Sequence, residues 1–236
     1  MVTNRFAAVV MTATVCSVLT SAARGQVVFY ENFDDENSGV PMLDYLDFTQ
    51  FTVADGSVDL LGPGLFDFIP GSGLYLDMDG TQFNAGTLVS ESITLPAGDY
   101  RLSFGLSFNV NPMPATNTME VVVGGMGVAS LSGIDGLNHA EFRLQQFEFT
   151  IPSATEGTLI FIHGGGDNGG YLLDEIELRR IECLPDTNGD GVLSPADFSA
   201  WVAAFNTQAP ECDQNGDGVC SPADFSAWVA NFNTGC

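Results

Sequence analysis

Apolar and polar residues alternate with a period of two through much of the chain before residue 181. Such alternation predicts strands that pack one face and expose the other. In the clearest case every second position is aromatic or aliphatic, namely Tyr100, Leu102, Phe104, Leu106 and Phe108. Weaker forms of the pattern predict further strands at 27–33, 50–54, 57–61, 74–78, 87–95, 118–123, 140–151, 159–163 and 171–179.

Short strands joined by links rich in Gly, Pro, Asn and Asp favour a mainly β fold. We predict a β-sandwich, most simply a jelly roll, over residues 26–181. Within the segment 140–151 the apolar phase changes between Phe142 and Phe147. That change predicts a β-bulge at positions 145–146.

The first 25 residues have the pattern of a secretory signal peptide. Arg5 precedes an uncharged apolar run over 6–19, and small residues flank Arg24 at a cleavage point. The run is shorter than the roughly 20 residues that cross a bilayer. We therefore expect cleavage near Gly25, a mature protein without a membrane span, and an extracellular or cell-surface location.

The composition narrows the classes of partner. The chain has 30 acidic residues against 6 Arg and no Lys, for a formal net charge of −24. Nucleic acids and anionic membranes attract cationic proteins, so neither is an expected partner. Because 45% of the residues are hydrophobic, the chain is not a disordered acidic tail and is expected to form a core.

One carboxylate is expected on a face that should be apolar. Alternation in the last strand puts Asp174 on the same face as Leu172, Ile176 and Leu178. An unpaired buried anion is strongly destabilising, and only four Arg remain after signal cleavage. Two alternatives stay open for its compensation: a structural Ca²⁺, or a set of backbone N–H donors.

Four stretches of this region resemble the galactose-binding-like jelly rolls of secreted proteins and, more loosely, carbohydrate-binding modules. They are residues 51–62, 73–80, 97–104 and 172–178. In those families an early acidic residue and an Asp of the last strand often share one structural Ca²⁺. The matching positions are Glu31 and Asp174, so the resemblance implies a metal site there and a polysaccharide as ligand.

Sugar-binding and catalytic side chains are not evident in this region. It contains no Trp, and its Tyr residues are expected to serve as strand residues. The Gly-rich segment 164–170 fits either a ligand loop or a tight turn. His139 and His163 lack metal-ligand spacing, and neither a Cys after signal cleavage nor a G-x-S-x-G motif occurs before Cys183. No catalytic residue is predicted.

The chain after residue 182 is a tandem repeat. Its first copy begins at Asp186 and recurs 27 residues later from Asp213 with few changes. Each copy has oxygen-bearing side chains at positions 1, 3, 5, 9 and 12, a carbonyl at 7 and Gly at 6, the spacing of an EF-hand Ca²⁺ loop. The expected ligands of the first loop are Asp186, Asn188, Asp190, the carbonyl of Val192, Ser194 and Asp197. Those of the second are Asp213, Asn215, Asp217, the carbonyl of Val219, Ser221 and Asp224.

A helix is predicted after each loop, because apolar residues follow at i, i+3, i+4 and i+7. These stripes are Phe198, Trp201, Val202 and Phe205, and then Phe225, Trp228, Val229 and Phe232. Pro195 and Pro222 stand where the helices begin. No helix is expected before either loop, so each unit is half of an EF-hand.

Two such units in tandem resemble a type I dockerin, here over residues 182–236, and the final Gly235-Cys236 resembles a variant of that family ending in Gly-Cys. The resemblance implies a cohesin-type receptor as partner, chosen by loop positions 10 and 11. Those positions are Pro195, Ala196, Pro222 and Ala223, where better-known dockerins often have Ser-Thr.

Four Cys remain after signal cleavage, which outside the cytosol indicates two disulfides with three possible pairings. The adjacent ends expected of a two-fold pair of units favour Cys183 with Cys236. Cys212 with Cys220 would then close the second loop. A segment this small needs such links, or bound Ca²⁺, to fold.

These features predict a secreted Ca²⁺-binding protein of two domains, with two Ca²⁺ in the terminal module and one more if the sandwich site exists. The jelly roll would bind carbohydrate, and the dockerin-like module would attach it to an extracellular assembly. Two alternatives remain: a polysaccharide-degrading enzyme, either a glycoside hydrolase or a lyase, and a non-catalytic structural surface or matrix protein.

Overall fold

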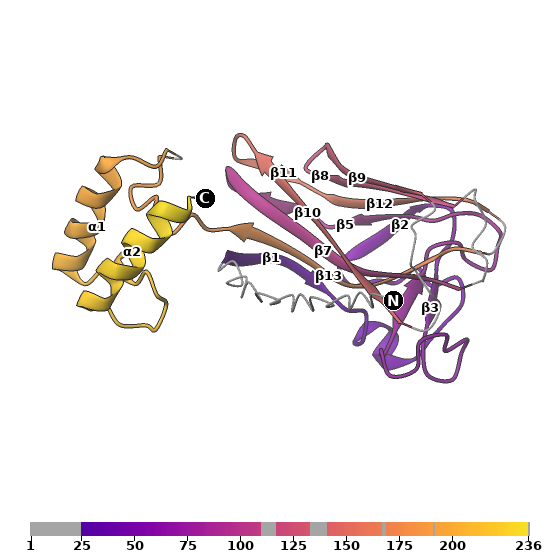
Figure 1. The fold of residues 1–236 in the computed structure, drawn as a ribbon. Helices are drawn as coiled ribbons and strands as arrows, with labels where there is room; N and C mark the ends of the chain where they lie inside the picture. Colours follow the sequence, from indigo (N-terminus) through magenta and orange to yellow (C-terminus); the bar gives the residue numbers. More distant parts are fainter. Residues whose placement is uncertain (1–24, 110–116, 133–140, 167–168, 191, 236) are drawn as a thin grey trace, which may run out of the picture.

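The computed structural model describes residues 25–109, 117–132, 141–166, 169–190 and 192–235. Figure 1 shows a body of strands before residue 181 and two helices after it, which confirms the predicted mainly β class. The predicted signal peptide lies outside the described residues, apart from Gly25. No helix in the described part combines the length and the apolar content that a membrane crossing requires.

The larger sheet has the strand order β10-β7-β13-β4-β3, and β1 also pairs with β13. All of its pairings are antiparallel. Its strands are β1 (Gly25–Glu31), β3 (Asp59–Leu61), β4 (Tyr75–Asp77), β7 (Gly98–Phe108), β10 (Arg143–Ile151) and β13 (Tyr171–Ile181). The last strand of the body, β13, therefore lies inside this sheet, with partners on both sides.

The second sheet has the order β2-β5-β12-β8-β9 and is also antiparallel. Its strands are β2 (Phe51–Asp55), β5 (Thr87–Ser90), β8 (Thr118–Val123), β9 (Met126–Ser132) and β12 (Leu159–Gly164). A two-stranded sheet joins β6 (Ile93–Leu95) to β11 (Thr155–Gly157), and a 3-10 helix, η1, spans Glu36–Gly39.

Ten strands were predicted, and most lie where the alternation put them. The predicted single strand 87–95 is wrong, because the chain leaves the second sheet after Ser90 and pairs with β11 from Ile93. Two strands were missed: β11, which is short and mostly exposed, and β9, which packs Met126, Val128, Ala129 and Leu131 against the core. β11 has no buried face and therefore little alternation to detect. In β9 the register shifts against β8, and this irregularity interrupts the alternation.

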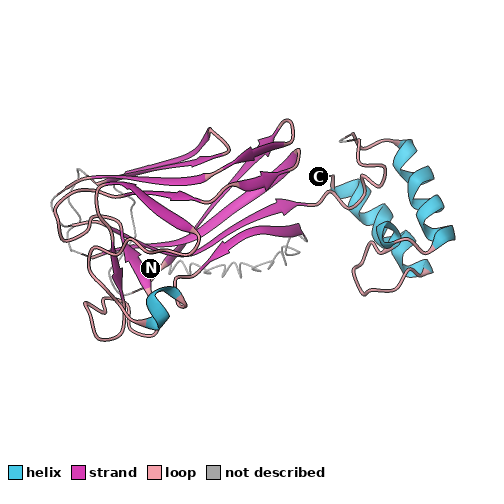
Figure 2. Cartoon of the chain, turned by 180° about the vertical axis from the view of Figure 1, so that it is seen from behind, coloured by secondary structure: helices cyan, strands magenta, loops and turns pink. Residues whose placement is uncertain are grey.

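The main core lies between the two large sheets, which Figure 2 shows edge-on as two layers of strands. The predicted inner face of β7 is confirmed, since Tyr100, Leu102, Phe104 and Leu106 are fully buried. The ring of Phe104 meets that of Phe161 from the opposite sheet edge-to-face, with 5.3 Å between centroids. Face-to-face packing of antiparallel sheets defines a β-sandwich.

The bulge predicted at 145–146 is wrong. β10 pairs with β7 in unbroken register from Arg143 opposite Leu106 to Ile151 opposite Gly98. Phe147 packs against the core, whereas Leu144 points outward and is 61% exposed. The apolar phase changes along β10 because the strand carries apolar residues on both faces.

A register shift occurs instead in β13, between Asp174 and Glu177 in its pairing with β7. Glu175 has a φ of 49° there, so one extra residue is accommodated and the alternation moves by one position. Leu173 and Ile176 both belong to the main core, while Leu172 belongs to a second cluster on the outer side. The predicted face of Asp174 is therefore corrected: it lies with Leu172 and opposite to Ile176 and Leu178, yet it is buried.

After β13 the chain forms α1 (Pro195–Thr207), the 3-10 helix η2 (Pro210–Cys212) and α2 (Pro222–Thr234). Both helices begin at the predicted Pro. Of the predicted apolar stripes, Trp201 and Trp228 are buried, whereas Phe198, Val202, Phe225 and Val229 are exposed. The helices meet through an aromatic cluster, in which Phe198 contacts Phe225 and Trp228, and Trp201 contacts Phe225. The outer side of this cluster remains exposed as an apolar ridge.

The predicted disulfide between Cys212 and Cys220 is present. Cys183 is disulfide-bonded as well. Its predicted partner, Cys236, lies outside the described residues.

Candidate functional site

The first acidic loop curls around its own carboxylates. The N–H of Asp190 donates to Asp186 Oδ1 (3.1 Å) and to Asn188 Oδ1 (2.9 Å), and the N–H of Val192 donates to Asp190 Oδ1 (2.8 Å). At its end, Asp197 accepts from Asn188 N (3.3 Å) and Ser194 N (2.8 Å). The side chains of positions 1, 3, 5 and 12 are thereby turned toward the inside of one loop.

The second loop repeats this arrangement. Asp213 Oδ1 accepts from Gly216 N (2.6 Å) and Asp217 N (3.1 Å), and Asp217 N also donates to Asn215 Oδ1 (2.9 Å). Asp224 Oδ1 accepts from Asn215 N (3.2 Å), and its Oδ2 accepts from Ser221 N (2.7 Å). Equivalent side chains in the two copies therefore have equivalent partners.

The twelfth residue of each loop has two structural roles. Asp197 and Asp224 close their loops, and each is also the N3 residue of a capping box with Ser194 or Ser221. Both side chains are 0% exposed. Burial raises the pKa of each carboxyl, but hydrogen bonds from backbone N–H groups outweigh it and hold the pKa below its usual value. Both carboxylates are therefore ionised inside a loop.

The donor chemistry of both loops fits Ca²⁺. All the converging groups are oxygens of Asp, Asn and Ser, which suit a hard cation. Among the described residues, no three His, Cys, Asp or Glu side chains are grouped to hold a metal by themselves. A cation in these loops would therefore also need the carboxamide, hydroxyl and carbonyl oxygens that the spacing supplies.

The residues predicted to contact a partner lie at the helix starts. Pro195, Ala196, Pro222 and Ala223 occupy the first turns of α1 and α2, and all four are exposed. The ring centroids of Phe198 and Phe225 are 5.9 Å apart, which joins the exposed ridges of the two helices. An exposed apolar ridge between two exposed helix starts is a surface suited to protein contact.

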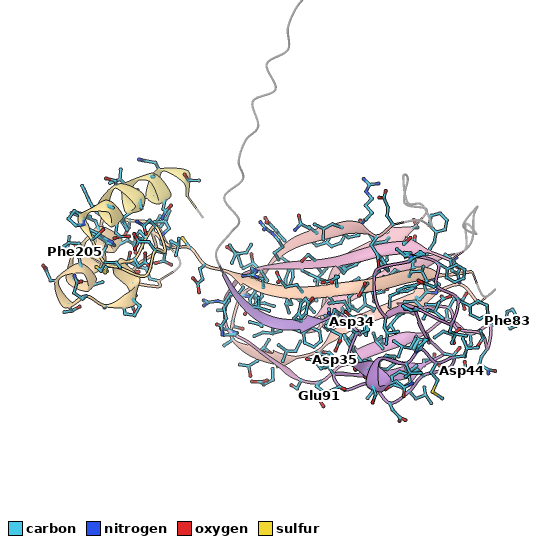
Figure 3. All side chains as sticks on the ribbon, turned by 90° about the horizontal axis from the view of Figure 1, so that it is seen from below. Asp34, Asp35, Asp44, Phe83, Glu91 and Phe205 are labelled. Atoms are coloured by element: carbon cyan, nitrogen blue, oxygen red, sulfur yellow. A yellow bond between two sulfur atoms is a disulfide. The ribbon has the colours of Figure 1, made fainter. Side chains whose placement is uncertain are left out.

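The sandwich brings together the two carboxylates predicted to share a metal. Glu31 ends β1 and pairs with Ile176 of β13, one bulge away from Asp174. Burial, together with the negative charges of Glu175, Asp34 and Glu31, raises the pKa of Asp174 to about 8. Figure 3 labels Asp34 on this part of the sandwich.

The alternative of backbone N–H donors finds partners in the structure for both carboxylates. Glu31 Oε1 accepts from Phe33 N (2.7 Å), and Asp174 Oδ1 accepts from Glu175 N (2.8 Å). Backbone donors therefore occupy one oxygen of each carboxyl. The second oxygen of Glu31 accepts from Gln50 Nε2 (2.8 Å), and in the described part of the chain no three His, Cys, Asp or Glu side chains are grouped here to hold a metal.

The sequence reasoning missed a second set of buried acids. Asp59 of β3 lies directly opposite Asp77 of β4, and Asp79 follows; all three are buried. Burial, together with the negative charges of Asp59 and Asp79, raises the pKa of Asp77 to about 8. The only signal in the sequence is the alternation of Asp77 and Asp79 with Leu76 and Met78; that the whole run 74–80 is buried is visible only in the structure.

Four of the five Tyr residues are strand residues, as predicted, whereas Tyr45 lies in a loop. Tyr45, Tyr75, Tyr100 and Tyr171 are buried, so none of them offers a ring to a sugar. Tyr30 is 44% exposed, and its hydroxyl donates to Glu175 Oε2 (2.7 Å). That hydrogen bond, followed by burial, raises the pKa of Tyr30 to about 12.

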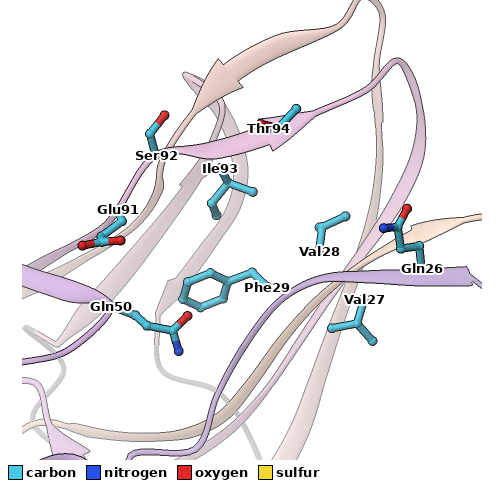
Figure 4. A pocket seen from close by; sticks show the side chains of 9 residues that line it. All are labelled: Gln26, Val27, Val28, Phe29, Gln50, Glu91, Ser92, Ile93 and Thr94. Atoms are coloured by element: carbon cyan, nitrogen blue, oxygen red, sulfur yellow. The ribbon is translucent and has the colours of Figure 1, made fainter.

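A groove of about 360 Å³ opens between β1 and β6 (Figure 4). Phe29 and Ile93 form its apolar wall, and Gln50, Glu91 and Thr94 line it with polar groups. The Nε2 of Gln50 donates to Glu31 Oε2 (2.8 Å) and to the carbonyl of Tyr30 (2.9 Å), so its amide is held in place. An aromatic wall with fixed polar groups is suited to a small polar ligand.

No protein-family model matches the chain, and no curated protein matches it. Among solved structures, the xylan-binding domain CBM22-1 of Paenibacillus barcinonensis Xyn10C is 15% identical, with 69% of this chain and 99% of that chain covered and a TM-score of 0.40. CBM35 from Paenibacillus barcinonensis is 22% identical, with 57% of this chain and 95% of that chain covered and a TM-score of 0.37. The C-terminal CBM6 of LamC from Zobellia galactanivorans is 11% identical, with 60% of this chain and 98% of that chain covered and a TM-score of 0.38. At these values the likeness assigns no ligand, activity or family to this chain.

Proposed function

We propose that this protein is a secreted, calcium-binding adaptor. Its terminal module binds two Ca²⁺, one in each acidic loop, and in that state docks onto a cohesin-type receptor. Its β-sandwich binds an extracellular carbohydrate. The proposal rests chiefly on one observation: two fully buried, ionised carboxylates, Asp197 and Asp224, each close a loop lined by oxygen donors.

Calcium is the ion favoured by the donor set. Six positions per loop, with an Asp able to bind through both oxygens, suit the coordination number of Ca²⁺ better than that of Mg²⁺. The charge also favours it, since each loop contains three Asp and neither contains a cation. Binding would relieve the repulsion among those carboxylates.

Calcium titration of the full chain by calorimetry tests this part of the proposal. We expect heat from two sites in the terminal module, and its loss in the double variant Asp197→Asn/Asp224→Asn. Glu120→Gln removes an equally charged but exposed strand carboxylate and should leave the binding unchanged. Absence of heat with the unmodified chain would refute the calcium sites.

A third ion is proposed for the sandwich, at Glu31 and Asp174. The negative charges of Glu31 and Asp34, which contribute to the raised pKa of Asp174, support it. Native mass spectrometry in calcium should then count three ions, and two in the variant Glu31→Gln. A count of two for the unmodified chain would leave backbone donors as the compensation for Asp174.

Docking is supported by the exposed first turns of α1 and α2 and by the ridge between them. Because both copies carry Pro-Ala at the same positions, we expect either helix to be able to face the receptor. Replacing Ala196 or Ala223 with Arg singly should therefore preserve cohesin binding, and the double replacement should abolish it. Complete loss from one replacement alone would contradict the two-fold surface.

Carbohydrate binding is supported by the sandwich and by the groove beside Gln50. A glycan array probed with the full chain, with and without EDTA, tests the ligand and its metal dependence together. Gln50→Ala should weaken any retained glycan, while Glu120→Gln should not. If no glycan is retained, the sandwich is better explained as a structural surface domain.

A further inference from the structure

The two calcium loops share their ligand residues but differ at the residue before the first ligand and at positions 2 and 8. In the second loop, Cys212 stands just before the first ligand and forms a disulfide with Cys220 at position 8. The equivalent residues of the first loop are Pro185 and Leu193. One loop is therefore closed covalently before any ion arrives, and the other is held only by its hydrogen bonds.

Each helix is fastened to the loop of the other repeat. The indole Nε1 of Trp201, in α1, donates to the carbonyl of Cys212 at the start of the second loop (3.1 Å). The indole Nε1 of Trp228, in α2, donates to Thr187 Oγ1 in the first loop (3.2 Å). Both indoles are buried. Ordering one loop therefore also orders the helix that follows the other.

A third link runs through Gln214, which is only 4% exposed. Its N–H donates to Oδ1 of Asp224, the last ligand of the second loop (2.9 Å). Its Nε2 donates to the carbonyl of Leu184, two residues before the first loop begins (2.7 Å). The final ligand of one site is thus connected through a single side chain to the start of the other.

We propose that Cys212, Cys220, Trp201 and Gln214 are positioning residues that make the second loop the tighter calcium site and couple its occupancy to that of the first. This inference rests on the proposed calcium binding. A disulfide removes conformational freedom from the empty loop, so less entropy is lost when the ion orders it. The cross-repeat hydrogen bonds then make each filled site favour the other, by the same factor in both directions.

Calorimetry on the full chain with matched position-5 variants tests the order of filling. The unmodified chain should bind Ca²⁺ in two steps, a tight step at the second loop and a weaker step at the first. Asp190→Ala disables the first loop, and the dissociation constant of the tight step should stay within about twofold of its value in the unmodified chain. Asp217→Ala disables the second loop. It should leave one step, about tenfold weaker than the weaker step of the unmodified chain, because coupling is then absent. Neither Asp belongs to a capping box, so both helices keep their starts.

The disulfide and the indole bond are tested separately. Cys212→Ser/Cys220→Ser should weaken the tight step by at least about tenfold, whereas Leu193→Ser at the matching position of the first loop should not. Trp201→Phe keeps an aromatic ring but removes the indole N–H donor. It should weaken the affinity of the weaker step to that of the single step in Asp217→Ala. Thr207→Val, which removes a hydroxyl bonded within α1, serves as its control.

Two equal and independent sites, or a first loop that stays tight in Asp217→Ala, would overturn this inference and leave the proposed calcium binding intact. No heat from either loop in the unmodified chain would instead overturn the calcium binding itself. Near-UV circular dichroism of the two Trp residues gives a second readout, and it should change with the first equivalent of Ca²⁺ in Asp190→Ala.

Discussion

The sandwich and the terminal module are stabilised in different ways. The sandwich buries a continuous core from two sheets, in which residues such as Leu102 and Phe104 are fully inaccessible. The described part of the module buries only three hydrophobic residues, Trp201, Cys212 and Trp228. Its acidic loops gather charge without cations. The sandwich has the apolar burial to fold alone, whereas the module depends on a disulfide and, we propose, on Ca²⁺.

Removing Ca²⁺ gives the largest expected difference between the two regions. In EDTA the module should lose its fixed structure, because the carboxylates of each loop then repel one another without compensation. Both Trp residues of the chain lie in the module, so near-UV circular dichroism of Trp reports on it alone. The β signal in the far UV should persist. Retention of the Trp signal in EDTA would show that the module does not depend on metal.

Phe104→Ala should strongly destabilise the other region, the sandwich. Removing a fully buried ring from between the sheets costs about 3–5 kcal/mol of the free energy of unfolding. Denaturant unfolding followed by far-UV circular dichroism should show the loss, and the Trp signal in calcium should keep its midpoint. A matching shift of the Trp midpoint would mean that the two regions unfold together.

The two regions should respond to pH with opposite signs. Asp77 has a pKa raised to about 8 in the fold, so the stability tied to its proton is present below pH 4 and is lost as the pH rises to about 8. Asp197 and Asp224 have lowered pKa values, so their contribution is present above pH 4 and is lost as the pH falls below it.

Unfolding of the sandwich at pH 5 and pH 8, in EDTA, checks the first sign. Its free energy should fall with pH by up to about 1.4 kcal/mol per unit for each such carboxyl. The module, followed by its Trp signal in calcium, should instead gain stability between pH 3 and pH 5. A sandwich that becomes more stable from pH 5 to pH 8 would contradict a protonated Asp77.

The smallest effect is expected from Arg101→Ala on the outer face of the sandwich. Arg101 forms an ion pair with Glu148 at 2.6 Å, but both side chains are substantially exposed. Such pairs contribute about 0.2–1 kcal/mol, and less in high salt. Unfolding in low and high salt measures this, and a loss above about 2 kcal/mol would indicate a role beyond the ion pair.

Local patterns were sufficient to predict much of the fold. The alternation from Tyr100 to Phe108 identified the inner face of β7, because that strand has one buried and one wet face. The apolar stripe after each loop and the Pro at each helix start predicted α1 and α2, since both signals come from residues near in sequence. The Cys212–Cys220 disulfide was also predicted, and it joins residues only 8 apart in the sequence.

The errors arose where distant contacts decide the phase of a strand. The face of Asp174 was wrong because Glu175 adopts a positive φ, which only the pairing with β7 makes visible. The split between β5 and β6 and the pair formed by Asp59 and Asp77 also depend on which strands become neighbours. Sequence spacing does not contain that information, so the buried acids outside the tandem loops were only partly found.

The connection between the two regions has a mechanical consequence. β13 lies inside the larger sheet, paired with β7 on one side and with β1 and β4 on the other, and it continues directly toward Cys183 and the first loop. Tension applied between an anchored module and a glycan held by the sandwich would pull β13 along its own axis. Its hydrogen bonds to the neighbouring strands would be loaded in shear and would have to break together. We therefore expect the connection through β13 to resist a high pulling force.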